Sequence, residues 1–256
     1  MIHPTASVDR HAEVDSSADI GPFTVIGSKV KIGPRTRIGP HAVVEGDTTI
    51  GADNQIFQFA AVGAIPQDLK YGGEPTRLVI GNANRIREFA TVHIGTAAGG
   101  GVTRVGNGCL LMANSHVAHD VQLGDGCILA NSTALAGHVV VEDHVIFGGL
   151  SAVHQFTRIG RLAFVSGGAM VTQDVPPYVT VQGDRAEVVG LNTVGLTRAH
   201  FDEHAIGRVK GAYKIVFRSK MGLREAIAHV KAEFGGHAEI DHFVAFLEGS
   251  QRGIAR

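Results

Sequence analysis

The feature that most constrains this chain is a repeat of six residues that begins at Ile2. Ile, Val or Leu recurs at every sixth position, is often followed by Gly, and has a small or β-branched residue four places after it. IGPFTV, IGSKVK and IGPRTR are examples. The register slips twice, resumes at Val105 and runs to Val171, with Phe147 as the one aromatic exception. A repeat of this length determines the architecture in which every single motif lies.

A period of six fits neither the helical period of 3.6 nor the alternation of a strand. It is typical of a parallel β-helix, in which three hexapeptides make one triangular coil and the aliphatic side chain points inward. About 26 hexapeptides predict roughly eight to nine coils, stacked about 4.8 Å apart. Cys109 and Cys127 stand one coil length apart, so we expect them to stack inside the prism as small core residues.

Two segments interrupt the repeat, at residues 66–79 and 96–104. We expect both to be loops that project from the rigid prism, where functional residues concentrate. The first combines charged side chains, Asp68 and Lys70 among them, with glycines. That composition suits a loop that folds over a polar ligand, such as one that carries phosphate.

The pattern becomes helical near residue 191. We predict three helices within residues 201–219, 222–234 and 238–249, and Asp202 is a candidate N-cap. Residues 1–190 are therefore expected to form the β-helix, and residues 191–256 a helical domain that covers its open end.

The composition excludes several classes of function. The formal net charge is −1, which argues against nucleic acid as the main partner. Two cysteines outside any CxxC motif, no signal sequence and no apolar run of about 20 residues predict a cytoplasmic protein without a membrane span. Six basic residues and no acidic one lie between Glu203 and Glu225, either as a solvated helix face or as a docking surface for an acidic partner.

Histidines are the strongest chemical signal. His116, His119, His138, His144 and His154 fall within about two coils, and Gly137 follows His119 by one coil length. A general base beside a backbone N–H that can stabilise an oxyanion is the minimal equipment for acyl transfer. Asp120, the next residue after His119, could orient the imidazole and stabilise its cation. Exposed surface histidines and a zinc site are the alternatives.

Several longer segments resemble one family in their order along the chain: QDLKYGGEPTRLVIG, NRIRE, HVAHD, LAGHV, AVHQF and QDVPPYV. The family is the UDP-N-acetylglucosamine O-acyltransferases, and the likeness spans essentially the whole chain. It implies a left-handed β-helix and a homotrimer with active sites between neighbouring prisms. The implied reaction moves a (R)-3-hydroxyacyl chain from acyl carrier protein to the 3-hydroxyl of UDP-N-acetylglucosamine, in lipid A biosynthesis, without metal or cofactor.

The resemblance also implies a role for individual residues. His119 would be the general base, Asp120 its partner and Gly137 the oxyanion donor. Gly167 would close the end of the acyl channel. The implied substrate contacts are Asp68, Lys70, His116, His138, His154, Gln155, Asn192 and Arg198.

Three positions depart from the family pattern. Ile94 stands where an arginine is usual, Val194 where a glutamate is usual, and Ala199 where a basic residue is usual. These departures concern recognition of the nucleotide sugar, so the 3-amino analogue of the acceptor stays open as a substrate. A metal-dependent hydratase of the same prism type is the alternative enzyme, and a non-catalytic scaffold would explain neither the loops nor the histidines.

Overall fold

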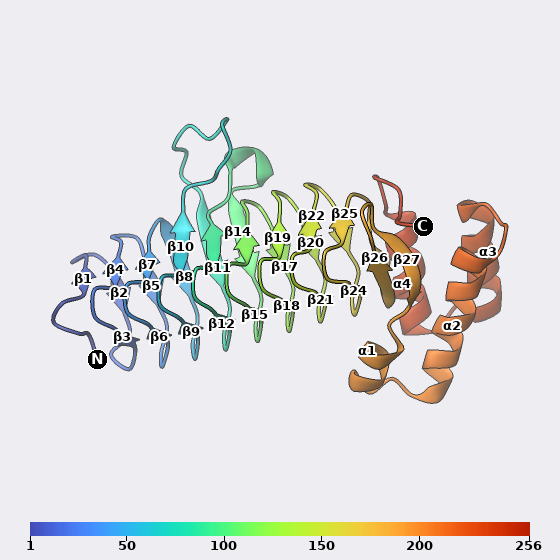
Figure 1. The fold of residues 1–256 in the computed structure, drawn as a ribbon, viewed down its shortest axis with the longest axis horizontal. Helices are drawn as coiled ribbons and strands as arrows, with labels where there is room; N and C mark the ends of the chain where they lie inside the picture. The colour runs from blue at the N-terminus through green and yellow to red at the C-terminus, as the bar shows by residue number, and fades with distance from the viewer.

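Each hexapeptide forms one short strand, and every third strand pairs in parallel within the same sheet. Figure 1 shows the resulting prism, in a computed structural model that describes residues 1–256. The first sheet contains β1 (Ser7–Val8), β4 (Val25–Ile26), β7 (Val43–Val44), β10 (Ala61–Ala64), β13 (Thr91–His93), β16 (His116–Val117), β19 (Ala134–Leu135), β22 (Ala152–Val153) and β25 (Met170–Val171).

Two further sheets complete the prism. The second contains β2 (Glu13–Val14), β5 (Lys31–Ile32), β8 (Asp47–Ile50), β11 (Arg77–Ile80), β14 (Val102–Val105), β17 (Gln122–Leu123), β20 (Val140–Val141) and β23 (Arg158–Ile159). The third contains β3 (Asp19–Ile20), β6 (Arg37–Ile38), β9 (Gln55–Ile56), β12 (Arg85–Ile86), β15 (Leu110–Leu111), β18 (Ile128–Leu129), β21 (Ile146–Phe147), β24 (Phe164–Val165), β26 (Val179–Gln182) and β27 (Glu187–Leu191).

The strand register confirms the coil length. Ser7 pairs with Val25, a separation of 25 − 7 = 18 residues. Gln55 pairs with Arg85, so that coil is 30 residues long and its excursion adds 30 − 18 = 12. Both excursions end earlier than predicted, because β11 begins at Arg77 and β14 at Val102, and these two strands pair with each other.

The repeated aliphatic side chains fill the interior of the prism. They belong to one cluster of 44 buried hydrophobic residues, in which Phe147 is fully buried. Cys109 and Cys127 are buried free thiols in neighbouring coils, as predicted. Burial in the interior therefore explains the repeat. The side chains available for chemistry lie at the corners of the prism.

The prism ends in elements that the repeat did not predict. β26 pairs in parallel with β24 and antiparallel with β27, which closes the third sheet with a hairpin. The short helix α1 (Thr193–Arg198) follows this hairpin and was not predicted either.

The helices α2 (Glu203–Arg218), α3 (Leu223–Phe234) and α4 (Ala238–Glu248) lie where three helices were expected. The Asp202 side chain accepts a hydrogen bond from the Ala205 N–H and caps α2, as predicted. The helices pack at the C-terminal end of the prism around a second cluster of 14 buried residues (Figure 1). None of the helices is long and apolar enough to cross a membrane.

Candidate active site

One edge of the prism carries most of the predicted site. Both excursions leave the prism here, and the short helix η1 (Ala97–Gly99) lies in the second of them. The turns at residues 118–121, 136–139 and 154–157 follow along the same edge, between strands of the first and second sheets. We call these three turns the histidine corner.

His119 and Asp120 are in direct contact at this corner. His119 Nδ1 lies 2.8 Å from Asp120 Oδ2, and because a carboxylate only accepts, the ring donates its Nδ1–H. Consecutive residues of a strand would point to opposite faces. Asp120 is instead a turn residue with φ +62°, which brings its side chain back beside the ring of its neighbour. This geometry leaves Nε2 of His119 as the atom that can accept a proton.

The Asp120 carboxylate is buried and held on several sides. Its side chain is 1 % exposed. The Thr96 N–H donates to Oδ1 at 2.8 Å, and the Thr96 hydroxyl donates to Oδ2 at 2.6 Å. A methyl group at Gly99 would lie 2.0 Å from the Asp120 Cγ, so only glycine lets the loop close over this carboxylate. The second excursion therefore holds Asp120 in place.

Gly137 lies beside the other end of the His119 ring. A methyl group on its α-carbon would be 2.7 Å from Nε2 of His119. The two residues belong to adjacent coils, since the His138 N–H donates to the His119 carbonyl oxygen. The Gly137 N–H has no acceptor within the chain. A base and a free amide donor therefore meet at one place, as expected for acyl transfer.

A cavity of about 310 Å³ opens in front of these groups. His116 contributes to its wall and is oriented by a contact of 2.7 Å between its Nδ1 and the Thr91 hydroxyl. His93 also lines the cavity, is 4 % exposed and has no hydrogen-bond partner at Nδ1. The remaining lining comes from Gln67, Ala118, His119, Ala134, Ala136, Gly137, Ala152 and Val153.

The surroundings keep the supporting histidines neutral. Burial, together with repulsion from His116 and His119, lowers the pKa of His93 from 6.5 to about 4. Burial also lowers the pKa of His116. The pKa of His138 is lowered by burial although Asp120 opposes the shift. Near pH 7 these rings therefore interact with ligands through hydrogen bonds rather than charge.

Comparisons with known proteins agree with this geometry. A family model described as UDP N-acetylglucosamine O-acyltransferase, domain 2, matches residues 174–255, and one described as bacterial transferase hexapeptide matches residues 11–46 and 103–137. A protein of Anaeromyxobacter sp. (strain Fw109-5), named acyl-[acyl-carrier-protein]--UDP-N-acetylglucosamine O-acyltransferase, is 63% identical over 255 residues, which cover 100% of this chain and 99% of its own.

The chain belongs to the UDP-N-acetylglucosamine O-acyltransferase family.

Further relatives support the same assignment. The protein of that name from Myxococcus xanthus is 62% identical over 211 residues, or 82% of each chain. The crystal structure of UDP-N-acetylglucosamine O-acyltransferase from Moraxella catarrhalis superposes with a TM-score of 0.97 at 42% identity, covering 100% of this chain and 99% of the other. This acyltransferase therefore has the left-handed β-helix of its family, although parallel crossovers are generally right-handed.

The resemblance to the acyltransferase family also implied further substrate contacts. Some of these residues lie at the histidine corner. His154 and Gln155 occupy its third turn and are exposed, and His154 Nδ1 lies 3.3 Å from Arg252 Nη2 of the C-terminal tail. Asp68 is in the first excursion, and its charge, like that of Asp120, opposes the lowering of the His138 pKa that burial causes. Lys70 is exposed in the same loop, and its N–H donates to the Asp68 carboxylate.

Other predicted residues lie elsewhere on the prism. Gly167 is exposed in the turn between β24 and β25, at the edge that joins the third sheet to the first. His144 was expected within the histidine cluster, but it follows β20 and lies at the edge between the second and third sheets. Nearness in sequence misled the prediction, because successive turns of one coil occupy different edges.

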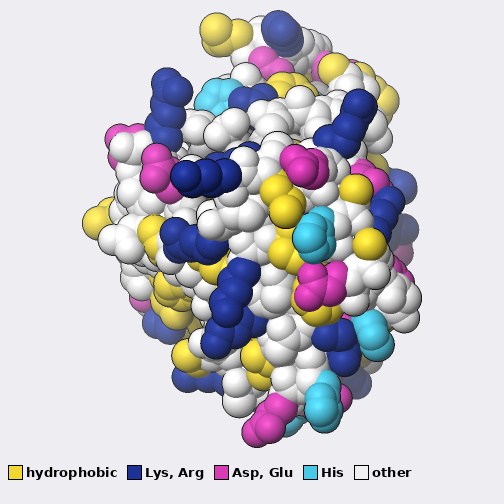
Figure 2. Space-filling model, turned by 90° about the vertical axis from the view of Figure 1, so that its right-hand side faces the viewer, with side chains coloured by type: hydrophobic (Ala, Val, Ile, Leu, Met, Phe, Trp, Pro, Cys, Tyr) yellow, Lys and Arg dark blue, Asp and Glu magenta, His cyan; other side chains and the backbone are white.

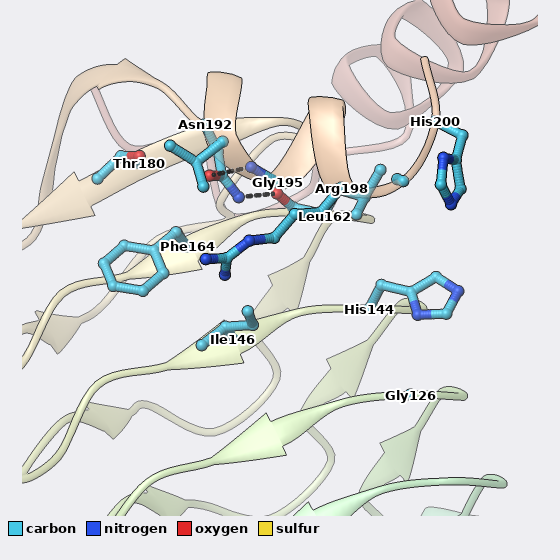
Figure 3. A pocket seen from close by; sticks show the side chains of 12 residues that line it. Gly126, His144, Ile146, Leu162, Phe164, Thr180, Asn192, Gly195, Arg198 and His200 are labelled. Carbon is cyan, nitrogen blue, oxygen red and sulfur yellow. Dashed lines mark hydrogen bonds between the residues drawn. The ribbon is translucent and has the colours of Figure 1, made fainter.

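A second and larger cavity, of about 730 Å³, lies over the third sheet and α1. It is lined by His144, Asn192 and Arg198 among others, and Figure 3 shows Arg198 extending into it. The Asn192 side chain already makes two hydrogen bonds within the chain. It accepts one from the Gly195 N–H and donates one to the Leu162 carbonyl (Figure 3). Asn192 and Arg198 thus share one cavity, on a different sheet from the cavity at His119.

The three departures from the family pattern fall at two places. Ile94 is buried in the core, and its Cγ2 would contact a methyl group built on Gly46, toward the N-terminal end. It does not line the cavity at His119. Val194 and Ala199 both line the second cavity, where Val194 is 60% exposed. The departures at Val194 and Ala199 therefore bear on that cavity, and Ile94 is a core residue.

His93, Gln67 and Thr96 were not predicted as site residues. His93 looked like any residue of a repeat, and its place in the cavity follows from the register Val92 with Val117. The sequence signal that could have found Gln67 and Thr96 was their position at the start of the two excursions.

Proposed function

We propose that this chain transfers a (R)-3-hydroxyacyl group from acyl carrier protein to the 3-hydroxyl of UDP-N-acetylglucosamine, in lipid A biosynthesis. The observation that carries the proposal is the placement of His119, with Nδ1 on the Asp120 carboxylate and Nε2 beside Gly137. The names of the relatives specify an acyl carrier protein as the donor and an oxygen of UDP-N-acetylglucosamine as the acceptor. We further propose that the enzyme is cytoplasmic, in line with its two free cysteines.

The reaction follows from this placement. His119 Nε2 removes the proton of the 3-hydroxyl while the hydroxyl oxygen attacks the thioester carbonyl carbon. A C–O bond forms, and the carbonyl oxygen becomes an oxyanion that accepts a hydrogen bond from the Gly137 N–H. The intermediate then collapses with cleavage of the C–S bond, and the leaving thiolate takes the proton from His119. Asp120 stabilises the imidazolium that exists between these two steps.

The energetic demands on the site are modest because a thioester is already activated. A positioned general base typically contributes 10²- to 10⁴-fold to the rate. One oxyanion donor contributes on the order of 3 kcal/mol in transition-state stabilisation. The buried carboxylate of Asp120 also keeps the proton on Nδ1, so that Nε2 is free to act as the base.

We propose that the active enzyme is a homotrimer in which the two cavities meet across the subunit interface. The edge between the third and first sheets carries a stack of rings, Phe23, His41, Phe59 and Phe89, with centroids 5.0 to 5.4 Å apart. The three phenylalanines are about half exposed, at 56%, 47% and 53%. Such a continuous exposed apolar ladder is typical of an interface.

This edge lies between the two faces that carry the cavities. The cavity at His119 opens on the first sheet and the cavity at Arg198 on the third. Three prisms that turn the aromatic edge toward a common axis place the third sheet of one copy against the first sheet of the next. Arg198 and Asn192 of one subunit would then bind the nucleotide whose sugar lies at His119 of its neighbour.

We propose the helical end as the docking surface for the carrier protein. Figure 2 shows lysines and arginines spread over this end of the molecule. Lys210, Lys214, Lys220 and Arg224 are exposed. Arg208 and Arg218 contribute less, because the former pairs with Glu239 at 2.6 Å and the latter is bound to the Tyr213 hydroxyl at 2.7 Å. Free cations on one face suit an acidic partner.

The test is a product analysis. Purified protein is incubated with UDP-N-acetylglucosamine or its 3-amino analogue and with 3-hydroxyacyl carrier proteins of several chain lengths, and product masses are measured. We expect an ester product from the 3-hydroxyl substrate. The His119→Ala variant should lose about 10²- to 10⁴-fold in rate while still assembling and binding the nucleotide, whereas His11→Ala, at the far end, should be unaffected. A His119→Ala enzyme of normal rate would refute the base assignment.

A further inference from the structure

Two imidazoles converge on the same carboxylate oxygen at the histidine corner. His119 Nδ1 lies 2.8 Å and His138 Nδ1 lies 3.7 Å from Asp120 Oδ2. The rings are almost perpendicular, at 88°, with centroids 5.1 Å apart. One ligand atom from each of the three side chains lies within 4.8 Å of the others. Ligand atoms around a tetrahedral zinc ion are about 3.3 Å apart, so these side chains need to move by only about 1 Å.

The surroundings already orient these groups as the outer partners of a metal site do. Thr96 donates to both oxygens of Asp120, through its N–H and its hydroxyl. The His138 ring is stacked on Phe156 at 4.4 Å and 7°, which sets its orientation. Outer partners of this kind typically raise metal affinity by 10- to 100-fold.

The cluster is open to solvent from a second side. A separate cavity of about 390 Å³ is lined by Asp120 and His138, together with Gly99, Gly100, Val102, Arg104, Gln122 and Val140. It does not include Gly137 or His116, which line the cavity in front of His119 Nε2. A small cation can therefore reach the carboxylate from behind, and water from this cavity can fill a fourth coordination position.

We propose that His119, Asp120 and His138 bind one divalent transition metal ion, with Zn²⁺ as the best match, and that the bound ion switches the general base off. Neutral imidazole and carboxylate ligands in a three-ligand set with an open position suit Zn²⁺. The alkaline-earth ions prefer sites made of oxygen atoms alone and are not expected to compete.

The switch follows from the proton on His119. Coordination at Nδ1 requires a free lone pair on this nitrogen, so the single ring proton, which now bridges to Asp120, moves to Nε2, and no net proton is released. With its one proton on Nε2, the imidazole no longer accepts the proton of the acceptor hydroxyl there. Metal binding and base catalysis exclude each other at one imidazole. This consequence rests on the proposed function, whereas the binding itself does not.

The decisive measurement is therefore a binding titration without substrate. Full-length protein, stripped of metal, is titrated with Zn²⁺ by calorimetry and with Co²⁺, whose visible absorption reports tetrahedral coordination. We expect one ion per chain and no net release of protons. His138→Gln and Asp120→Asn should each weaken binding by about tenfold or more. The matched control is His229→Gln, which removes a histidine from an exposed pair with Glu233 at 3.4 Å.

Spectra of ¹⁵N-histidine wild-type protein give a readout that needs no variant. Zn²⁺ should shift Nδ1 of His119 and leave its Nε2 protonated. Equal Zn²⁺ affinity in wild type and His138→Gln, or loss only in His229→Gln, would overturn the proposal. In the acyl-transfer assay Zn²⁺ should inhibit and a chelator should restore the rate. An enzyme inactive without any Zn²⁺ would instead contradict the proposed function while leaving the binding result intact.

Discussion

The ring of His119 packs against the α-carbon of Gly137, one coil further along the prism. A methyl group built on that carbon would lie 2.5 Å from Cε1 and 2.7 Å from Nε2. The contact is possible only because residue 137 has no side chain. Glycine therefore has two effects here, since it admits the imidazole and leaves its own N–H beside the atom that acts as the base.

The change Gly137→Ala should consequently inactivate the enzyme without unfolding it. The added methyl group must push the imidazole away from the reacting oxygen, and we expect kcat to fall at least about 100-fold, the effect of losing one oxyanion donor or a positioned base. Steady-state kinetics and circular dichroism measure the two effects. Gly207→Ala is the control, because a methyl group there meets nothing within 4 Å. A Gly137→Ala enzyme of normal kcat would contradict this account.

The change Arg198→Ala should weaken binding of the nucleotide sugar more than it slows the chemistry. Arg198 is exposed in the cavity over the third sheet, away from the histidine corner. We expect KM for UDP-N-acetylglucosamine to rise about tenfold, as for the loss of one charge-assisted contact, and kcat to change little. Arg10→Ala, at the opposite end, is the control. A fall in kcat at unchanged KM would place Arg198 in the chemical step instead.

The double change Lys214→Glu and Lys220→Glu should impair use of the carrier-bound donor. Both side chains are exposed, and reversing their charge should repel an acidic partner and slow association. We expect kcat/KM for the acyl carrier protein to fall about tenfold, with a weaker dependence on salt. Lys29→Glu, on the N-terminal half of the prism, serves as the control. An unchanged KM for the carrier protein would identify the lysines as an ordinary solvated surface.

The stability of the protein should depend on pH through His93. Its pKa is about 4 in the folded chain because the ring is buried, against 6.5 for an exposed histidine. The unfolded chain therefore binds a proton that the folded chain does not, and stability falls as the pH drops from about 6.5 to about 4. A shift of this size corresponds to about 3 kcal/mol.

Urea unfolding at several pH values tests this expectation. Between pH 6.5 and pH 4 the midpoint of the wild type should fall more than that of His93→Gln, because glutamine does not titrate. His237→Gln provides a matched control, since His237 is exposed and its side chain caps no helix. Parallel curves for wild type and His93→Gln would show that His93 does not limit stability in acid.

The sequence by itself determined the architecture, because the period of six is a property of neighbouring residues. An aliphatic side chain at every sixth position can be buried only if each hexapeptide forms one side of a coil, and the register then repeats. The same arithmetic correctly placed Gly137 beside His119 and Cys109 beside Cys127. The three long helices and the Asp202 cap also depend on local spacing, and the structure confirms them.

Only the tertiary structure decided which histidines meet. His144 appeared equivalent to His138 in sequence. The prism has three edges, however, and the two histidines lie on different ones. The contact between His119 and Asp120 needed a turn residue with positive φ, which no spacing rule reveals. The unpartnered His93, and the separation of Arg198 from His119 onto different sheets, likewise result from how coils stack. Local periodicity specifies the coil, whereas the direction of each side chain at a corner depends on backbone angles and on the loops packed against it.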